Sequence, residues 1–425
     1  MSKRRKILVS AYACNPASSA QLHPGEDIIG WELVNQLCRF HDVWVITHRY
    51  NKAGFPKDGT AGLPISQARF HFIALPRPFW NLYRFDIGER LYYYFWQILA
   101  WRVARRLHER IGFDIAHHIT FNNDWIPSFI GAFLPVPFVW GPVGGGQKTP
   151  PGFLGVYSLK DRVADYIRDF GQIIGREILL TRQRCLKKAR VILVCNKETK
   201  RRMPSKYALK IQFFPVNGIQ ESDLAGADDR DRLDGQPRDF RILTTGRLVH
   251  WKYFEAAIRS FAIFSRNHPE ARLSLIGDGS QKNALMMLAR DLEIRDRVQF
   301  TAWMKRADLL ETMRRSDVFL YPSLREGGGA VVVEAMASGL PVICLDLAGP
   351  SLHIQETCGL KIEPRDPDSA VREMAAALER LSRDGEWRRS LGRAARARAR
   401  DVYLWDRLGE RLQRIYESLE PLGPG

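Results

Sequence analysis

Cysteine is scarce in this chain. None of the six cysteines forms a CxxC pair or lies near a histidine cluster at zinc-site spacing, which argues against a structural zinc site and favours buried thiols in a reducing cytosol. Long apolar runs are also missing, since no stretch approaches the ~20 apolar residues of a membrane span. The N-terminal apolar run of about five residues is too short for a signal peptide and is typical of a first strand. We therefore expect a cytoplasmic protein, whose membrane contact would be peripheral at the inner face of the cell membrane.

Acidic residues are outnumbered, with 47 Asp and Glu against 64 Lys and Arg and a net charge of +17. This surplus implies an anionic partner: nucleic acid, an anionic membrane surface or a polyphosphate substrate. No nucleic-acid recognition motif accompanies the charge, so we do not expect nucleic acid. The 425 residues are too many for one ordinary core and suit two domains of about 200 residues each.

Short β-branched runs alternate with longer amphipathic runs in both halves of the chain. The expected strands are 6–12, 42–48, 69–75, 113–119, 137–141 and 191–196, then 241–246, 271–277, 297–303, 318–323, 341–346 and 359–364. Continuous apolar strands with helices between them predict parallel sheets covered on both faces, the α/β doubly wound arrangement.

The alternation also predicts the domain boundaries. We expect an N-terminal Rossmann-like domain over 1–219 and a polar linker or surface loop over 220–240. A second Rossmann-like domain follows over 241–395. A basic helical segment over 396–425 is expected to pack back on the N-terminal domain.

The segment 323–343 carries three glycines between an expected strand and an expected helix. Glycines there let the backbone approach a ligand closely, and the helix N-terminus offers free N–H groups to a phosphate. Glu326 can reach sugar hydroxyls beside the phosphates, and Glu334, about a turn and a half deeper, can accept hydrogen bonds from a ribose diol. A Gly-rich turn between two solvated glutamates is the less favoured alternative. The residues assigned to this donor-binding segment are Glu326, Gly327, Gly328, Gly329, Ala330, Val331 and Glu334.

Two further strand ends carry glycines. After the strand that ends at Thr245, Gly246 allows a tight turn, and Arg247 and Lys252 can converge on one phosphate group. Gly277 occupies a similar position in LIGDG. Each motif alone is weak, because charged loops and glycine turns are common. Together they lie at carboxyl ends of strands expected in one sheet, where ligands bind in such folds.

In combination, GRLVHWK, LIGDG and REGGGAVVVEAMASGLPVI resemble retaining glycosyltransferases of family 4, which have the GT-B fold with two Rossmann-like domains facing across a cleft. The resemblance implies that Glu326 contacts donor-sugar hydroxyls and that Glu334 binds ribose. It further implies that Arg247 and Lys252 neutralise the diphosphate, while the loop 301–306 lies near the base. The chain departs from the family after the lysine. Tyr253 stands where the family usually has Gly, so the phosphate loop can be tighter or differently angled.

The N-terminal half shows a thinner resemblance to the same family. The loop after the first strand ends at Gly25, where the resemblance implies a glycine that faces the donor phosphates. His117 and His118 end a strand where the family has a histidine near the reacting sugar carbon. Neighbouring strand residues point to opposite faces, so one of the two faces the cleft, and His118 is favoured. A plain turn and packing histidines are the alternatives.

The expected activity is hexosyl transfer with retention, from a nucleoside-diphosphate sugar to a hydroxyl. The catalytic residues assigned are His118, Arg247, Lys252 and Glu326. No metal or other cofactor is expected, because the DxD-like triplets 229–231 and 366–368 fall in loops away from the donor-binding segment. A nucleotide-sugar epimerase or hydrolase on the same fold, and a non-catalytic sugar-binding protein, are the alternatives.

The acceptor is expected to be a glycan, with a lipid-linked glycan of exopolysaccharide, capsule or lipopolysaccharide assembly favoured. The stretches 79–112 and 158–190 mix apolar or aromatic residues with basic ones and could lie on an anionic membrane surface. Amphipathic helices packed on the sheet with a solvated basic face explain them equally well.

Overall fold

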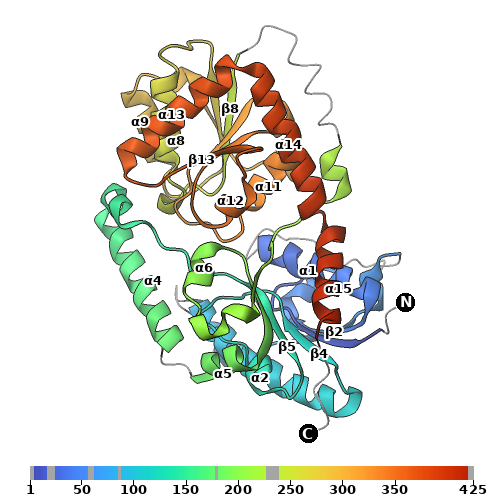
Figure 1. Ribbon diagram of the computed structural model, residues 1–425. Helices are drawn as coiled ribbons and strands as arrows, with labels where there is room; N and C mark the ends of the chain where they lie inside the picture. Colours follow the sequence, from blue (N-terminus) through green and yellow to red (C-terminus); the bar gives the residue numbers. More distant parts are fainter. Residues whose placement is uncertain are drawn as a thin grey trace.

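The structure is a computed structural model that describes residues 4–16, 24–55, 62–84, 88–177, 180–225 and 239–419. It contains two parallel β-sheets, one in each half of the chain, and each sheet is flanked by helices (Figure 1). The two doubly wound α/β domains predicted from the alternation of strands and helices are therefore confirmed.

The N-terminal sheet has the strand order β3-β2-β1-β4-β5-β6-β7, and all of its neighbouring strands are parallel. Its strands are β1 (Lys6–Ser10), β2 (Asp42–His48), β3 (Arg69–Ile73), β4 (Ile115–His118), β5 (Phe138–Val143), β6 (Ala189–Val194) and β7 (Ile211–Phe213). Ile7 and Val9 of β1 belong to the core on one face of the sheet, and Leu8 belongs to the core on the other. This alternation buries both faces and explains why the strands are apolar throughout.

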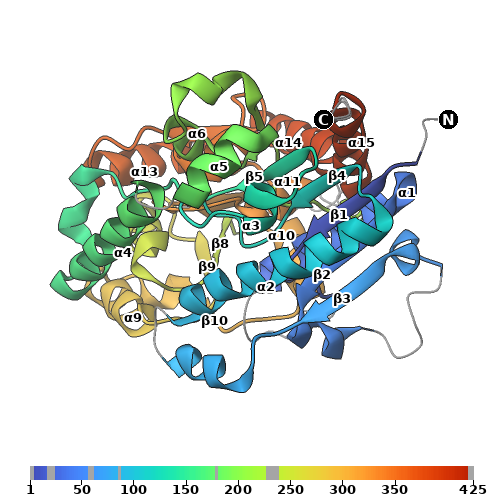
Figure 2. The ribbon, with the colours of Figure 1, turned by 90° about the horizontal axis from the view of Figure 1, so that it is seen from below.

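Helices connect these strands. They are α1 (Pro24–Phe40), α2 (Gly88–Ile111), α3 (Phe129–Phe133), α4 (Leu159–Glu177), α5 (Leu180–Lys188) and α6 (Lys197–Arg201). Residues from α2, such as Trp96, share one core with Leu8, while residues from α1, such as Leu33, share the other core with Val9. Helix α4 is different, because it extends along the outer edge of the molecule (Figures 1 and 2).

The C-terminal sheet has the order β10-β9-β8-β11-β12-β13 and is also parallel. Its strands are β8 (Arg241–Thr245), β9 (Arg272–Ile276), β10 (Val298–Thr301), β11 (Val318–Tyr321), β12 (Val342–Leu345) and β13 (Gly359–Ile362). Its helices include α8 (Phe254–Phe264), α9 (Lys282–Asp291), α10 (Arg306–Arg314), α11 (Ala330–Ala337), α12 (Ala348–His353) and α13 (Pro367–Arg383). The strand order reverses between β8 and β11, and ligands bind at such a switch point in open α/β sheets.

The two domains are joined at two adjacent crossings of the chain. Helix α14 (Gly385–Tyr403) packs on α11, whereas α15 (Trp405–Glu417) packs on α1 of the N-terminal domain. Between them, the Ile219 N–H donates to the Tyr403 carbonyl at 2.8 Å, and the Trp405 N–H donates to the Ile219 carbonyl at 3.1 Å. The segment predicted over 396–425 thus starts inside α14, and its described part returns to the N-terminal domain only from Trp405.

The structure can also be compared with several smaller predictions from the sequence. The short strand β7, Ile211–Phe213, was not among the expected strands. Residues Glu221–Leu224 of the expected linker form a 3-10 turn, η6, and residues 226–238, with the triplet 229–231, lie outside the described residues. Asp366 of the second triplet caps α13 by accepting the Ser369 N–H at 2.8 Å.

All six cysteines are buried and form no disulfide. Within the described ranges, no helix combines the length and the apolar character needed to cross a bilayer.

Candidate donor-binding site

Lys252, Tyr321 and Glu326 form a hydrogen-bonded triad at the switch point of the C-terminal sheet. Lys252 closes a 3-10 turn after β8, Tyr321 ends β11, and Glu326 lies in the loop before α11. The Lys252 Nζ donates to Tyr321 Oη at 2.6 Å and forms an ion pair with Glu326, and Tyr321 Oη donates to Glu326 Oε2 at 2.6 Å. The structure therefore brings together the lysine and the first glutamate of the two predicted motifs, 74 residues apart in sequence.

The electrostatics of the triad favour a charged glutamate. Burial alone would raise the pKa of Glu326, but the Lys252 charge and hydrogen bonds from Lys252, Tyr321 and the Gly329 N–H lower this pKa below its usual value. Burial and the neighbouring Glu326 raise the pKa of Tyr321 well above 10, so its hydroxyl stays protonated. A lysine ammonium has three N–H donors. Within the part of the chain that the structure describes, Tyr321 and Glu326 engage two of them, so the third can bind an anion.

Gly328 and Gly329 hold the loop before α11 in a conformation and position that larger residues would disturb. Gly329 is the N-cap of α11 and has a left-handed φ of 65°, which favours glycine. A Cβ on Gly328 would lie 2.1 Å from Val216 Cγ1 and 2.4 Å from Asn217 Nδ2 of the N-terminal side. The predicted residues Ala330 and Val331 form the first turn of α11, where N–H groups have no intrahelical acceptor. The loop thus presents free donors at the place where the two domains touch.

A direct hydrogen bond also joins the domains at this loop. The Asn196 Nδ2 of the N-terminal domain donates to the Gly327 carbonyl at 3.2 Å. A Cβ on Gly327 would have no atom nearer than 3.8 Å, so this glycine faces more open space than its neighbour.

Gly246 and Gly277 lie at the adjacent ends of β8 and β9. Both have positive φ, 150° and 144°, and a Cβ on Gly277 would lie 2.0 Å from the Gly246 carbonyl oxygen. Packing of one turn on the other is therefore enough to require glycine at Gly277. Arg247 follows Gly246 and is exposed, with its guanidinium carbon 5.9 Å from the centre of the Trp251 ring. Among the described residues, no carboxylate pairs with this guanidinium.

Glu334 occupies a second charged cluster, deeper along α11. It accepts a hydrogen bond from Arg306 Nε at 2.7 Å, and the other Arg306 nitrogens bind both oxygens of Asp223 at 2.7 and 2.8 Å. Burial raises the pKa of Glu334 although the Arg306 charge opposes the rise. Glu334 is therefore held in place by Arg306 and does not share the Lys252 triad.

Tyr253 explains the one departure from the resembled motif. Its φ of 51° and ψ of 39° place it in the left-handed region at the N-cap of α8, a conformation that glycine adopts most easily. The side chain is nearly fully buried, and its ring packs edge-on to Phe153 at a centroid distance of 5.7 Å. Burial of this ring against a residue from the N-terminal half offsets the conformational cost at a position where glycine is usual in the resembled family.

Both strand-end histidines are buried, and both ring nitrogens of each have hydrogen-bond partners. His118 contacts Tyr93 Oη at 2.8 Å and Ser128 Oγ at 3.0 Å, and its carbonyl accepts from Asn122 Nδ2 at 2.6 Å. His117 contacts Tyr416 Oη at 2.5 Å and the Gly141 carbonyl at 2.7 Å. Burial lowers the pKa of His117 to about 4 and that of His118 to about 3, so both are neutral near pH 7. The structure does not bring either side chain into the Lys252 triad.

Gly25 lies in the first turn of α1 and is exposed. A Cβ at this position would have no heavy atom within 4 Å, so packing within the described residues does not require glycine here. The predicted role facing the donor phosphates remains a prediction.

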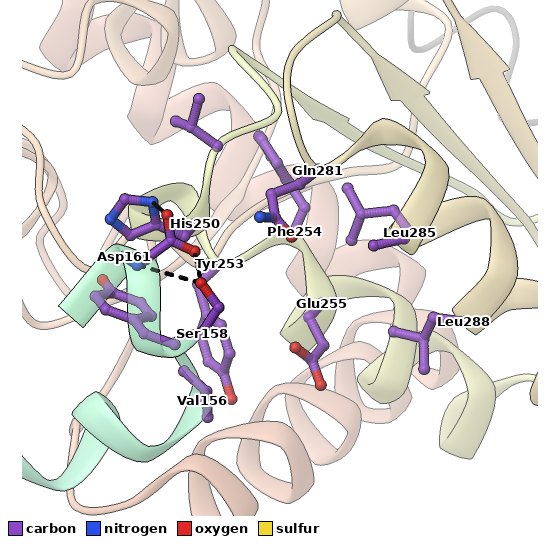
Figure 3. Close-up of a pocket in the computed structure, with 13 residues that line it drawn as sticks. Val156, Ser158, Asp161, His250, Tyr253, Phe254, Glu255, Gln281, Leu285 and Leu288 are labelled. Atoms are coloured by element: carbon purple, nitrogen blue, oxygen red, sulfur yellow. Dashed lines mark hydrogen bonds and ion pairs between the residues drawn. The ribbon is translucent and has the colours of Figure 1, made fainter. Parts of the chain in front are cut away.

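A separate cavity of about 310 Å³ lies beside this site, between the start of α4 and helices α8 and α9 (Figure 3). Tyr157, Asp161, His250 and Tyr253 are among the residues that line it, and the Lys252 triad is not. His250 Nδ1 lies 3.1 Å from Asp161 of α4, so the cavity marks a contact between α4 and the loop after β8.

Four residues of the site were not predicted individually. Tyr321 ends an apolar strand, and the sequence pattern there does not distinguish a functional tyrosine from a core aromatic residue. Arg306 lies in the segment predicted near the base. Asp223 lies in the polar segment interpreted as a linker, where nothing in the sequence indicated a site residue. Asn196 follows a strand, and its contact with Gly327 depends on how the two domains face each other.

The C-terminal half of the chain is similar in sequence to known glycosyltransferases. Residues 227–398 match the family model described as Glycosyl transferases group 1. A D-inositol 3-phosphate glycosyltransferase of Corynebacterium kroppenstedtii is 32% identical over 212 residues, covering 48% of this chain and 46% of the relative. The lipopolysaccharide core biosynthesis glycosyltransferase LpsE of Rhizobium meliloti is 28% identical over 222 residues, covering 50% and 62%. The chain spans about half the length of most of the curated relatives it matches.

Solved structures resemble the whole chain. Sucrose-phosphate synthase from Thermosynechococcus elongatus aligns with a TM-score of 0.65 at 19% identity, covering 97% of this chain and 98% of that one. HepE of Anabaena, solved in complex with UDP and glucose, aligns with a TM-score of 0.59 at 16% identity and covers 98% and 100%. At such low identity, the likeness establishes the fold, and it confirms the predicted GT-B architecture.

Proposed function

We propose that this chain, whose C-terminal half carries a group 1 glycosyl transferase domain, transfers a hexose from a nucleoside-diphosphate sugar to a hydroxyl acceptor with retention of configuration. The observation that carries the proposal is the Lys252, Tyr321 and Glu326 triad beside the N-terminus of α11. It brings together a cation from the turn after β8 with a charged carboxylate and free backbone donors from the loop before α11, which is the chemistry that a sugar diphosphate requires.

The leaving diphosphate gains negative charge as the glycosidic bond breaks. Lys252 has one N–H donor left for it, Arg247 is exposed nearby, and the first turn of α11 contributes N–H groups and the positive end of its dipole. Preorganised donors of this kind stabilise the transition state more than the ground state. The charged Glu326 is suited to accept hydrogen bonds from donor-sugar hydroxyls. Attack on the face that the diphosphate leaves, with the phosphate accepting the proton, gives retention without a covalent intermediate.

The nucleoside half of the donor is assigned to the Glu334 cluster. Glu334 lies deeper on α11 than the phosphate loop, and Arg306 fixes its orientation. A carboxylate held in this way can accept both hydroxyls of a ribose. Arg306 is the last residue of the segment 301–306, where the base is expected, and it starts α10.

A glycan is the proposed acceptor, with a lipid-linked glycan on the cytoplasmic side of a membrane favoured. The relative LpsE is named for lipopolysaccharide core biosynthesis. The net charge of +17 suits both an anionic donor and an anionic surface. A nucleotide-sugar epimerase or hydrolase on the same fold is the second candidate, because it would use the same donor contacts.

Thermal unfolding in the presence of UDP-, GDP- and ADP-sugars tests the donor class. We expect sugar nucleotides of one base to raise the melting temperature, since a ligand that binds only the native state stabilises it. If none of the nucleotide sugars raises the melting temperature, the proposal is refuted. Analysis of products with and without an added glycan acceptor then separates transfer from epimerisation and hydrolysis.

A further inference from the structure

Helix α4 turns its apolar face to solvent and its polar face to the protein, which is the reverse of a normal surface helix. Its exposed face is formed by apolar side chains that recur at steps of three and four residues. They are Leu159, Val163, Tyr166, Ile167, Phe170, Ile173 and Ile174, and Leu159, Tyr166 and Phe170 are 76%, 65% and 65% exposed. Among the described residues of α4, Lys160 is the one charged side chain classed as exposed.

The polar residues of α4 face the protein instead. Asp161 pairs with His250 at 3.1 Å, and Asp165 pairs with Arg325 at 2.9 Å. Towards the other end of the helix, the Arg176 Nε binds Asp124 at 2.6 Å. These contacts fix the polar face of α4 against the protein, so its apolar face is left in solvent.

We infer that α4 docks the protein on an anionic bilayer by inserting this apolar face at the lipid interface. An exposed apolar stripe of this length is unfavourable in free energy when it faces water. Such stripes are typical of helices that lie in the plane of a membrane. The next helix, α5, begins with Leu180, which is 79% exposed, and carries the exposed cations Arg184 and Lys187. Basic residues beside an apolar face add attraction to anionic lipids.

A second copy of the chain fits this face less well. A helix of 19 residues is about 28 Å long and about 10 Å wide, so it covers only about 300 Å². A stable interface needs about 800 Å² from each partner. Two copies with a charge of +17 each also repel one another, whereas an anionic bilayer attracts both.

Docking through α4 would orient the donor site relative to the membrane. Asp165 contacts Arg325, which precedes Glu326, and Asp161 contacts His250, which lies two residues before Lys252. The helix that would touch the lipid is therefore in contact with both loops of the donor triad. This inference rests on the proposed function for its biological sense, because it would bring the cleft to a lipid-linked acceptor.

Vesicle sedimentation tests the inference directly. We expect the full chain to bind vesicles of phosphatidylcholine with phosphatidylglycerol and to bind pure phosphatidylcholine vesicles much more weakly. The double variant Ile167→Gln/Phe170→Gln should weaken binding to the anionic vesicles by at least about tenfold, because it removes two inserted side chains. Met287→Gln, which changes a 60% exposed apolar residue on α9, is the matched control and should bind like the wild type.

Three results would overturn the inference: no vesicle binding by the wild type, equal binding to neutral and anionic vesicles, or unchanged binding by the double variant. A dimer in sedimentation equilibrium that the double variant abolishes would assign the face to a second copy and would also overturn it. Circular dichroism checks that each variant folds. Calorimetric titration with nucleotide sugars in the absence of vesicles tests the proposed function separately, and the double variant should bind its donor normally.

Discussion

Lys252 and Glu326 form a partly buried ion pair that Tyr321 joins through hydrogen bonds to both partners. One partner follows β8 and the other precedes α11, so the pair ties together two loops that are distant in sequence. It also holds a negative charge beside the place proposed for a diphosphate. A bound donor must therefore compete with Glu326 for Lys252, or share the ammonium with it.

Replacement of Lys252 should separate catalysis from stability. Lys252→Met is expected to lower kcat by at least about 100-fold, because a charge that stabilises the leaving group is lost. It should also lower the free energy of unfolding by about 3 kcal/mol, because Glu326 stays buried without its cation. Adding Glu326→Gln should restore most of the stability but none of the activity. Urea unfolding and steady-state kinetics provide the two measurements.

The control for this experiment is Lys282→Met. Lys282 forms an exposed ion pair with Asp278 in the same domain, at 3.1 Å. Exposed pairs contribute little, so both stability and turnover should remain near wild type. Wild-type kcat in Lys252→Met would show that the lysine has no role in departure of the diphosphate.

Glu334→Gln should weaken donor binding more than it slows chemistry. Loss of a charged acceptor for the ribose hydroxyls is expected to raise the donor KM by about 10- to 100-fold, since a hydrogen bond to a charged group contributes about 1.5–3 kcal/mol. The value of kcat should change much less. Glu311→Gln removes an exposed glutamate paired with Arg315 and is the control. An unchanged KM in Glu334→Gln would exclude the ribose assignment.

His117 should make the fold sensitive to acid. Burial lowers its pKa from 6.5 to about 4, so between these values the unfolded chain binds a proton that the folded chain does not. Stability is therefore full above pH 6.5 and falls as the pH drops towards 4, by about 2 kcal/mol at pH 5 from this residue. His117→Gln should lose correspondingly less stability between pH 7.5 and 5 in urea titrations.

Tyr416→Phe provides the comparison for this pH effect. It removes the hydroxyl that lies 2.5 Å from His117 Nδ1 but leaves the buried imidazole in place. The variant should be less stable at every pH and keep the wild-type dependence on acid. If His117→Gln shows the same acid dependence as the wild type, other groups cause the effect.

The sequence predicted both sheets because strand burial leaves a clear pattern. Strands such as β11 and β12 are apolar at every position and are flanked by turn residues, so their existence and parallel arrangement follow from local patterns. The approach of Lys252 to Glu326 could be anticipated as well, since both follow strands of one sheet. These predictions needed only the rule that ligands gather at carboxyl ends of strands.

Contacts that depend on the packing of distant segments could not be predicted in this way. Nothing near Asp223 in sequence shows that it binds Arg306, 83 residues later. The orientation of α4 is a similar case. Its periodicity indicates an amphipathic helix, but only the ion pair from Asp165 to Arg325 shows that the polar face is the inner one.

Two glycines allow a last test of which positions serve a ligand and which serve packing. Gly25→Ala adds a methyl group in open space and, in a helix, should leave stability equal or slightly higher. It should nevertheless lower kcat/KM if donor phosphates approach this backbone. Gly328→Ala places its methyl 2.1 Å from Val216, so it should lower both the melting temperature and activity. Full activity in Gly25→Ala would limit the phosphate site to the C-terminal domain, because no other glycine of α1's first turn remains to face it.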